Sequence, residues 1–303
     1  MDQRAELSEF LRSRRARLKP GDVGLPDFGR HRRVPGLRRE ELAQLAGVSV
    51  AYYTRLEQGN GQNVSAEVLD AIARALRLTD AEQQHLTHLA KPTASKKKKA
   101  GGGRQAAVRP QLHHLIDSME AVPAYILGRR LDLLAWNRMA AALIGGFVDL
   151  PAEERNLARH IFLDPTAREL YVDWQDKAAE VVGVLRLCAG CYPDDPLLTA
   201  LVGELSVKSD EFRTLWAAHT VRQKGHGTKR LHHPVVGELT LSYETLKLPE
   251  EHDLSLVTYY AEPGSPSADS LRLLASWAAA PDPSGPEGHP ASATPPTRSR
   301  PSS

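Results

Sequence analysis

Residues 36–60 constrain the fold more than any other part of the chain, because they specify two short helices around a glycine. Gly47 stands where a helix C-terminus favours a residue that tolerates positive φ. Ser49 follows as a suitable N-cap for the next helix, which turns Tyr53 and Leu56 inward. The first helix has an apolar face at helical spacing, formed by Leu37, Leu42, Leu45 and Ala46.

Two helices this short bury little surface alone, and the sequence supplies further helices on both sides. Helical patterns cover residues 6–18 and 65–76, and a capping box at Thr79 to Glu82 opens another helix that runs to about residue 89. Five helices with this central pair are typical of a helix-turn-helix domain, whose second helix lies in the DNA major groove.

The central stretch closely resembles the Xre/Cro-repressor type of helix-turn-helix. Three segments carry the resemblance: Glu40-Glu41-Leu42-Ala43, Gly47-Val48-Ser49 and Leu56-Glu57-Gln58-Gly59. The resemblance places the base-reading residues at Val50, Ala51 and Arg55. It also implies that Arg39 contacts phosphate, because many members have a backbone-contacting glutamine there. The full set of expected DNA contacts is Arg38, Arg39, Ser49, Val50, Ala51, Tyr52, Thr54 and Arg55.

The chemistry of these side chains fits those roles. The guanidinium of Arg55 can bind guanine O6 and N7 together, whereas Val50 and Ala51 can make only apolar contacts, as to a thymine methyl. The alternative for Arg55 is a solvated charge on a helix surface. Tyr53 is expected in the core, and Glu57 is expected to pair with an arginine of the first helix such as Arg15.

Composition separates the two halves of the 303-residue chain. Residues 1–104 carry 20 Lys and Arg against 12 Asp and Glu, a net charge of +8, whereas the remainder carries 19 against 25, a net charge of −6. A basic first part is expected where only that part meets nucleic acid. Two cysteines, no long apolar run and no signal peptide predict a cytoplasmic protein outside the membrane.

The predicted organisation is a helix-turn-helix domain at 1–91, a basic flexible linker at 92–109, a second domain at 110–280 and a disordered tail at 281–303. The lysine run and three glycines define the linker. A loop at 20–35 is expected to lie on the phosphate backbone through Arg30, His31, Arg32 and Arg33.

The second domain shows two strands, a block of helices, three more strands and a last helix. This order predicts an α+β PAS-like domain, an antiparallel sheet with helices on one side enclosing a pocket. The expected strands are 123–128, 130–136, 229–233, 236–246 and 254–261. The expected helices are 137–143, 154–162, 166–187, 196–205, 210–219 and 267–278.

The chain as a whole resembles the MmyB-like regulators of bacteria over about residues 5–278. The segments that carry this include Leu-Gly-Arg-Arg-Leu-Asp-Leu-Leu-Ala-Trp-Asn at 127–137, Phe-Leu-Asp-Pro at 162–165 and His-Pro-Val-Val-Gly-Glu-Leu at 233–239. The resemblance implies an Xre-type DNA-binding domain joined to a PAS-like domain that binds small, fatty-acid-like ligands. Its expected pocket residues, unless they are ordinary core aromatics, are Trp136, Asn137, Trp174, Trp216, His219, Tyr243 and Tyr259.

Other candidate sites are weaker. Cys188 and Cys191 have the spacing of half a zinc site but lack a second pair, and His232 and His233 are expected at an exposed strand end. No spacing supports a catalytic triad or a carboxylate pair, so we expect no enzyme, no metal and no cofactor. The predicted protein is a transcriptional regulator that binds double-stranded DNA as a homodimer. The alternative is a regulator whose second domain mediates protein interactions without a ligand.

Overall fold

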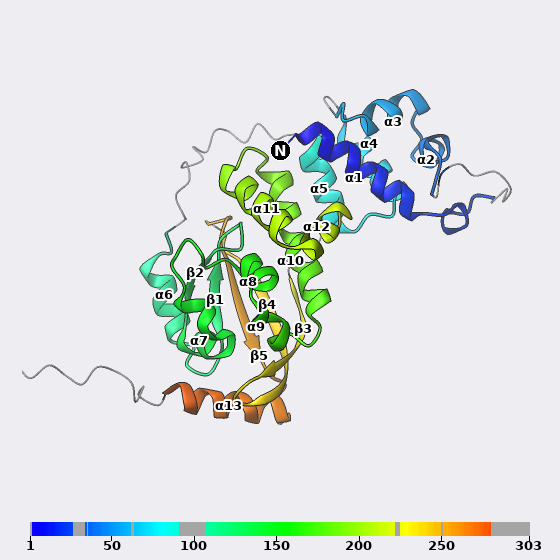
Figure 1. The fold of residues 1–303 in the computed structure, drawn as a ribbon. Coiled ribbons are helices and arrows are strands. Elements are labelled where there is room, and N and C mark those ends of the chain that lie inside the picture. The colour runs from blue at the N-terminus through cyan, green and yellow to red at the C-terminus, as the bar shows by residue number, and fades with distance from the viewer. Residues whose placement is uncertain are drawn as a thin grey trace, which may run out of the picture.

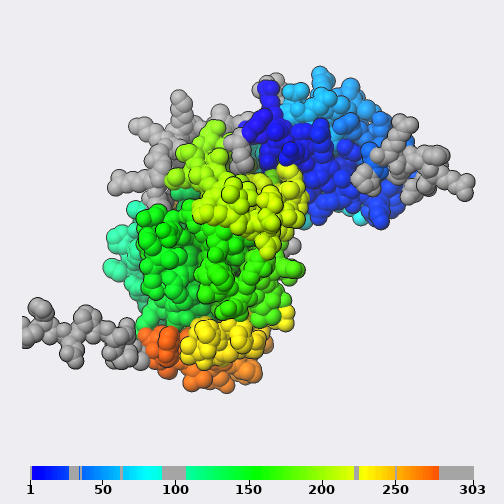
Figure 2. Space-filling model, in the orientation of Figure 1, coloured from blue at the N-terminus to red at the C-terminus, as the bar shows by residue number. Residues whose placement is uncertain are grey.

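The computed structural model describes residues 2–26, 34, 36–61, 64–90, 107–221, 225–249 and 251–279. The expected linker at 92–109 falls largely outside these residues, as do the tail at 281–303 and the basic loop residues 30–33. The described chain forms an N-terminal helical domain and a C-terminal α+β domain, which pack against each other (Figure 1, Figure 2).

The N-terminal domain contains five α-helices in its described residues, as the sequence predicts. They are α1 (Gln3–Arg17), α2 (Arg39–Leu45), α3 (Val50–Glu57), α4 (Ala66–Ala75) and α5 (Asp80–Ala90), with a short 3-10 helix η1 (Pro20–Val23) after α1. Their apolar faces meet in one core that includes Leu7, Phe10, Leu42, Tyr53 and Ile72. Burial of these faces stabilises helices that would be too short to persist alone.

The local signals around the central helix pair have the predicted geometry. Gly47 has a φ of +66° between α2 and α3, where an L side chain would be strained. The hydroxyl of Ser49 accepts a hydrogen bond from the backbone N–H of Tyr52 at 3.1 Å. Thr79 and Glu82 form the predicted reciprocal capping box at the start of α5. Gly47 and Ser49 thus define the turn from α2 into α3, and the capping box defines the start of α5.

The C-terminal domain is built on a five-stranded antiparallel sheet in the order β2-β1-β5-β4-β3. Its strands are β1 (Ala124–Leu127), β2 (Leu133–Trp136), β3 (His226–His233), β4 (Gly237–Lys247) and β5 (Ser255–Tyr260). Its helices are α6 (Pro110–Asp117), α7 (Arg138–Ile144), α8 (Leu157–Leu163), α9 (Pro165–Leu170), α10 (Trp174–Cys191), α11 (Pro196–Lys208), α12 (Asp210–Ala217) and α13 (Pro266–Ala279), with a 3-10 helix η2 (Gly145–Asp149).

Successive side chains of β1 point to opposite faces of the sheet, and each face packs against its own core. Tyr125 and Leu127 of β1 face the main core, which the helices from α7 to α13 share, whereas Ala124 and Ile126 face a smaller core with α6. Because β1 is central and covered on both sides, all four of its residues are buried. Strand β4 is half buried: Leu239 and Leu241 face the core, whereas Glu238 and Thr240 are exposed.

Two predicted elements are wrong in their extent. The expected helix at 166–187 is interrupted, because Tyr171 is extended and pairs with Leu231 of β3 in an isolated bridge. The expected strand at 130–136 begins only at Leu133, because residues before it form a turn in which Leu131 has a φ of +67°. In the first case the helical spacing of apolar residues extends past Tyr171, although pairing with β3 holds the backbone there in an extended conformation.

Candidate functional sites

The exposed surface of α3 holds most of the expected DNA contacts on one side of the helix. Val50, Ala51 and Arg55 are exposed, whereas Tyr53 and Leu56 are fully buried beneath them. Among the described residues, no ion pair or side-chain hydrogen bond engages Arg55. Its guanidinium is therefore available to a ligand. The remaining predicted contacts lie around this face: Arg38 and Ser49 are exposed, and Arg39, Tyr52 and Thr54 are partly buried.

A buried carboxylate ties α3 to the two helices beside it. Glu57 is 0% exposed and accepts hydrogen bonds from Arg15 of α1 at 2.8 Å and from Nε of Arg39 at the start of α2. The predicted pair of Glu57 with Arg15 is thus confirmed. The hydrogen bond and charge of Glu57 raise the pKa of Arg39. The sequence predicts Arg39 only as a phosphate contact, so its pairing with Glu57 is an additional finding of the structure.

The interior of the C-terminal domain holds an unusual polar group between α10 and the sheet. Lys177 is 1% exposed, and its ammonium lies 3.3 Å from the carboxylate of Glu180. Lys229 of β3 also contacts that carboxylate, so two largely buried ammonium groups share one partner. Burial lowers the pKa of Lys177, but Glu180 and the neighbouring tyrosines outweigh it and raise the pKa overall, which keeps the group charged.

Four buried tyrosines surround these lysines. Lys177 lies over the ring of Tyr171 and Lys229 over the ring of Tyr243. The hydroxyls of Tyr125 and Tyr259 lie 3.3 Å apart at the neighbouring strands. Burial raises the pKa values of Tyr125, Tyr171 and Tyr259, so these hydroxyls stay protonated and can donate hydrogen bonds.

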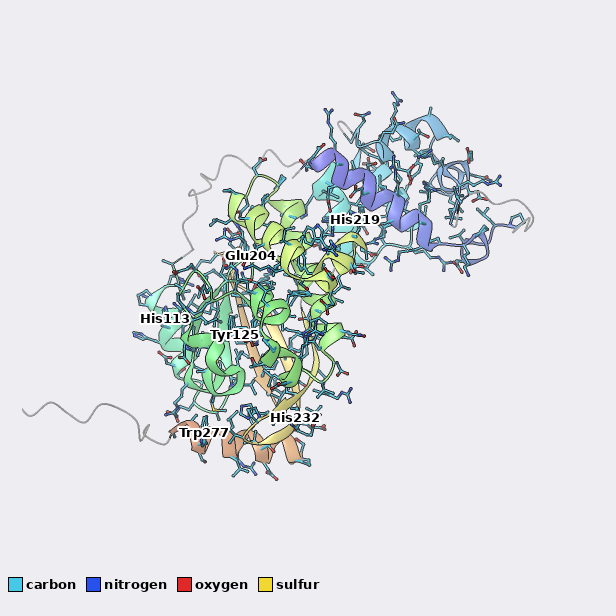
Figure 3. The ribbon with its side chains drawn as sticks, viewed as in Figure 1. His113, Tyr125, Glu204, His219, His232 and Trp277 are labelled. Atoms are coloured by element: carbon cyan, nitrogen blue, oxygen red, sulfur yellow. The ribbon has the colours of Figure 1, made fainter. Side chains whose placement is uncertain are left out.

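The structure does not bring the seven expected pocket residues together. Tyr243 and Tyr259 lie side by side in the polar interior, with ring centroids 6.0 Å apart. Trp174 and Trp216 each pack against a neighbouring phenylalanine of the core. His219 lies at the boundary with the N-terminal domain, as Figure 3 shows, where it contacts Glu6 and Glu9.

The other two expected residues have structural partners. The amide of Asn137 donates to the carbonyls of Ile116, Met119 and Val122, and its oxygen caps α7. It thereby ties α6 to the sheet. The ring of Trp136 is covered by the guanidinium of Arg155, at 4.8 Å from the ring centroid.

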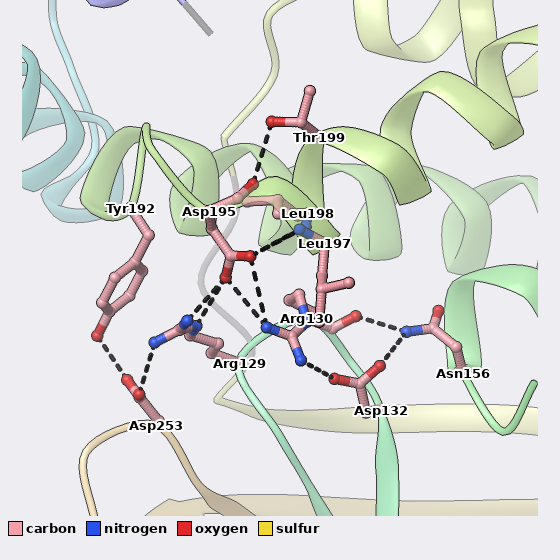
Figure 4. Close-up of polar contacts among 10 residues, drawn as sticks. All are labelled: Arg129, Arg130, Asp132, Asn156, Tyr192, Asp195, Leu197, Leu198, Thr199 and Asp253. Carbon is pink, nitrogen blue, oxygen red and sulfur yellow. Dashed lines mark hydrogen bonds and ion pairs between the residues drawn. The ribbon is translucent and has the colours of Figure 1, made fainter. Parts of the chain in front are cut away.

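A separate ion-pair network fixes the turn between β1 and β2 to the start of α11 (Figure 4). Asp195 accepts hydrogen bonds from the guanidinium groups of Arg129 and Arg130 and caps the helix through the N–H groups of Leu197 and Leu198. Arg129 also pairs with Asp253 at 2.9 Å. Every member has partners within the domain, which marks the network as structural.

The cysteines and histidines considered as metal ligands have other contacts in the structure. Cys188 is buried, and Sγ of Cys191 lies 3.3 Å from Nδ1 of His88 in the N-terminal domain. The expectation of an exposed His233 is wrong: it is 4% exposed, and its Nε2 lies 2.9 Å from the carbonyl oxygen of Ala142.

Among the described residues, one group of three side chains has metal-ligand spacing, formed by Glu6, Glu9 and His219. Nδ1 of His219 already accepts a hydrogen bond from Arg186, which also pairs with Glu6. The guanidinium of Arg186 therefore supplies the positive charge that a metal ion would supply in this group.

Comparison with known proteins agrees with this architecture. A family model for the MmyB-like transcription regulator ligand binding domain matches residues 108–274, and one for a helix-turn-helix domain matches residues 6–86. A search of the curated proteins gives no match. No helix in the described part of the chain is both long enough and apolar enough to cross a bilayer.

The two domains together define a DNA-binding transcriptional regulator with a ligand-binding domain. Within that class, the chain belongs to the MmyB-like transcription regulators, since the match to that family covers more than half of its length.

Proposed function

We propose that the protein binds specific DNA sequences as a homodimer, with α3 of each copy in the major groove of one half-site. The exposed face of α3 carries this proposal, because Arg55 is exposed beside Val50 and Ala51. One recognition helix contacts only a few base pairs, so two half-sites are needed for useful specificity. Arg38 and Arg39 would contact phosphate at the start of α2.

Selection of bound sequences from a random DNA pool tests this function. A dimer that reads two half-sites selects a repeated motif with a fixed spacing of about 10 base pairs or a multiple. Affinity for the selected duplex should fall steeply with salt, since lysine and arginine contacts release counterions from phosphate. Recovery of no common motif would contradict sequence-specific binding.

We further propose that a small apolar ligand of the fatty-acid type binds in the interior of the C-terminal domain. The observation in favour is the charge of that interior: among the described residues, the ammonium groups of Lys177 and Lys229 both pair with the carboxylate of Glu180, beside four tyrosines. An anionic head group would balance this charge, and the surrounding core would hold an apolar tail.

A second candidate is a C-terminal domain that mediates protein contacts and binds no ligand. In favour of it, aromatic side chains fill the core from α8 to α12, where Phe162 packs edge-on against both Trp174 and Phe212. Mass spectrometry of the purified protein separates the two candidates. A retained fatty acid in stoichiometric amount supports the ligand, whereas a bare chain that also fails to bind sodium laurate supports the interaction module.

A further inference from the structure

Helix α10 belongs to both domains of the molecule. Its first half lies in the interior of the C-terminal domain, where Lys177 and Glu180 form the buried ion pair. Its second half keeps Leu185 and Cys188 in the core of that domain. Another side of the same half packs against the N-terminal domain, where Arg186 and Gly190 contact α1 and α5. Figure 1 shows this helix running from the sheet to the boundary between the domains.

Arg186 is the centre of the contact between the domains. The side chain is 1% exposed, and its guanidinium pairs with the carboxylate of Glu6 in α1. It also donates to Nδ1 of His219 at 2.9 Å and to the carbonyl of Trp216, and it lies over the Trp216 ring at 4.2 Å. A charge buried this fully is costly unless its partners hold it, so the contact depends on Glu6.

His219 extends the same contact to a second carboxylate. Because its Nδ1 accepts from Arg186, the ring proton lies on Nε2, which is 3.0 Å from Glu9. Arg14 of α1 donates in turn to the backbone carbonyl of His219. His219 has a positive φ of +51°, which is uncommon for a residue other than glycine. Both the side chain and the backbone of His219, at the end of α12, are thus bound to residues of α1.

Apolar packing accompanies these polar contacts. Val221, which follows α12, is 4% exposed and belongs to the core of the N-terminal domain, with Leu187 of α10 beside it. Gly190 of α10 lies directly against His85 of α5, since a Cβ at Gly190 would fall 2.6 Å from the imidazole ring. The C-terminal domain therefore completes the core of the DNA-binding domain.

Helix α1 continues this connection to the DNA-binding face. It carries Glu6, the partner of Arg186, and two turns further Arg15, a partner of Glu57. Glu57 in turn lies on α3 and holds Arg39 of α2. One series of packed helices and buried ion pairs thus runs from Lys177 through α10 and α1 to the two helices that are to meet DNA.

We propose that α10 couples the interior of the C-terminal domain to the DNA-binding domain, and that Arg186 is the positioning residue that transmits this coupling to α1. The inference rests on the proposed function, whose ligand would contact the same end of α10. A change at Lys177 would shift α10, and the buried pair of Arg186 with Glu6 would transfer the shift to α1.

A double-mutant cycle in the full chain tests the coupling. The variants are Lys177→Met, Arg186→Gln and their combination, with the exposed Lys208→Met and Arg213→Gln as matched controls. Two quantities are measured for each: amide hydrogen exchange in α1 and α5, and affinity for the selected duplex. Lys229→Met, which removes the other ammonium from Glu180, replaces Lys177→Met if the latter does not fold.

In the wild-type background, Lys177→Met should change DNA affinity and exchange in α1 by a factor within the range of about 5 to 150 typical of coupled sites. In the Arg186→Gln background the same substitution should change either quantity less than about twofold, since the connection is already broken. The two control substitutions should leave both unchanged.

An equal effect of Lys177→Met with and without Arg186, or no effect in either background, would overturn the coupling. The exchange measurement needs no DNA, so it decides the inference independently of the proposed function. A wild-type chain that selects no DNA motif would refute that function while leaving the cycle on α1 and α5 intact.

Discussion

Arg186 of α10 and Glu6 of α1 form a buried ion pair that joins residues 180 positions apart and holds the two domains together. Burial raises the pKa of Glu6, but the contact with His219 and the charge and hydrogen bond of Arg186 outweigh it and lower the pKa to about 2. Glu6 is therefore ionised at neutral pH. The DNA-binding domain is therefore held against the C-terminal domain by this ion pair, and the linker is not its sole connection.

The first prediction is that Glu6→Gln destabilises the full chain by about 3–5 kcal/mol, because it leaves the buried guanidinium of Arg186 without a counter-charge. Chemical denaturation followed by circular dichroism measures the change. Glu9→Gln is the matched control, since the side chain of Glu9 is 58% exposed and it should cost less than about 1 kcal/mol. Equal losses from the two substitutions would contradict the assigned role of Arg186.

The second prediction concerns acid. Burial lowers the pKa of His85 to about 3, below the value of about 6.5 of an unfolded histidine. The unfolded state therefore binds more protons between pH 6.5 and 3, and the free energy of unfolding falls by about 1.4 kcal/mol per unit as the pH is lowered through this window. Above pH 6.5 this contribution is fully present.

Glu6 adds a loss of the same sign at lower pH, between the ordinary glutamate pKa of 4.5 and its pKa of about 2 in the folded chain. Burial also lowers the pKa values of His88 and His160, which add losses of the same sign, so the share of His85 is read from its substitution between pH 6 and 4.5. In that range, denaturation curves of His85→Leu should show a flatter pH dependence than those of the wild type. Parallel slopes for the two proteins would mean that His85 is not the titrating group.

The third prediction uses two glycines. Gly190→Ala places a Cβ 2.6 Å from the His85 ring and should destabilise the chain by about 1–3 kcal/mol by forcing α10 and α5 apart. Gly203→Ala in α11 meets no atom within 4 Å and should stabilise by about 1 kcal/mol through helix propensity. Thermal unfolding of both variants provides the comparison, and a stabilised Gly190→Ala would exclude the close helix contact.

The sequence predicts those features that depend on residues close together in the chain, such as the ends of helices and the buried side of a helix. Gly47, Ser49 and Thr79 mark helix ends through local backbone chemistry, and the periodicity of Tyr53 and Leu56 sets which side of α3 is buried. Resemblance to families added the identity of the domains. These signals sufficed for five helices and for the face that is expected to meet DNA.

Tertiary contacts decided the rest. Nothing near Arg186 in the sequence indicates that its partner is Glu6, and the buried Lys177 could equally have been a surface residue of an amphipathic helix. His219 was expected in a pocket because its type and domain suited one, yet the packing of α12 on α1 places it between the domains. Such positions depend on how two domains meet, which no local pattern encodes.

A fourth prediction concerns the buried carboxylate of the DNA-binding domain. Glu57→Gln should lower the free energy of unfolding by about 3–5 kcal/mol, since Glu57 is 0% exposed and balances both Arg15 and Arg39. Denaturation of the full chain measures this, with the exposed Glu40→Gln as the control. Near-neutral stability of Glu57→Gln would show that the two arginines do not depend on this carboxylate.

The most direct test of the account is a binding titration of the selected operator and a scrambled duplex with the wild type, Arg55→Ala and Arg39→Ala. If Arg55 spans a guanine edge, Arg55→Ala should weaken operator binding by about 1–3 kcal/mol, relax preference at one base pair and leave the scrambled duplex nearly unaffected. Arg39→Ala should weaken both duplexes alike, as a phosphate contact does. Equal losses on both duplexes for Arg55→Ala would make Arg55 a backbone contact, and no loss on either would contradict the placement of α3 in the major groove.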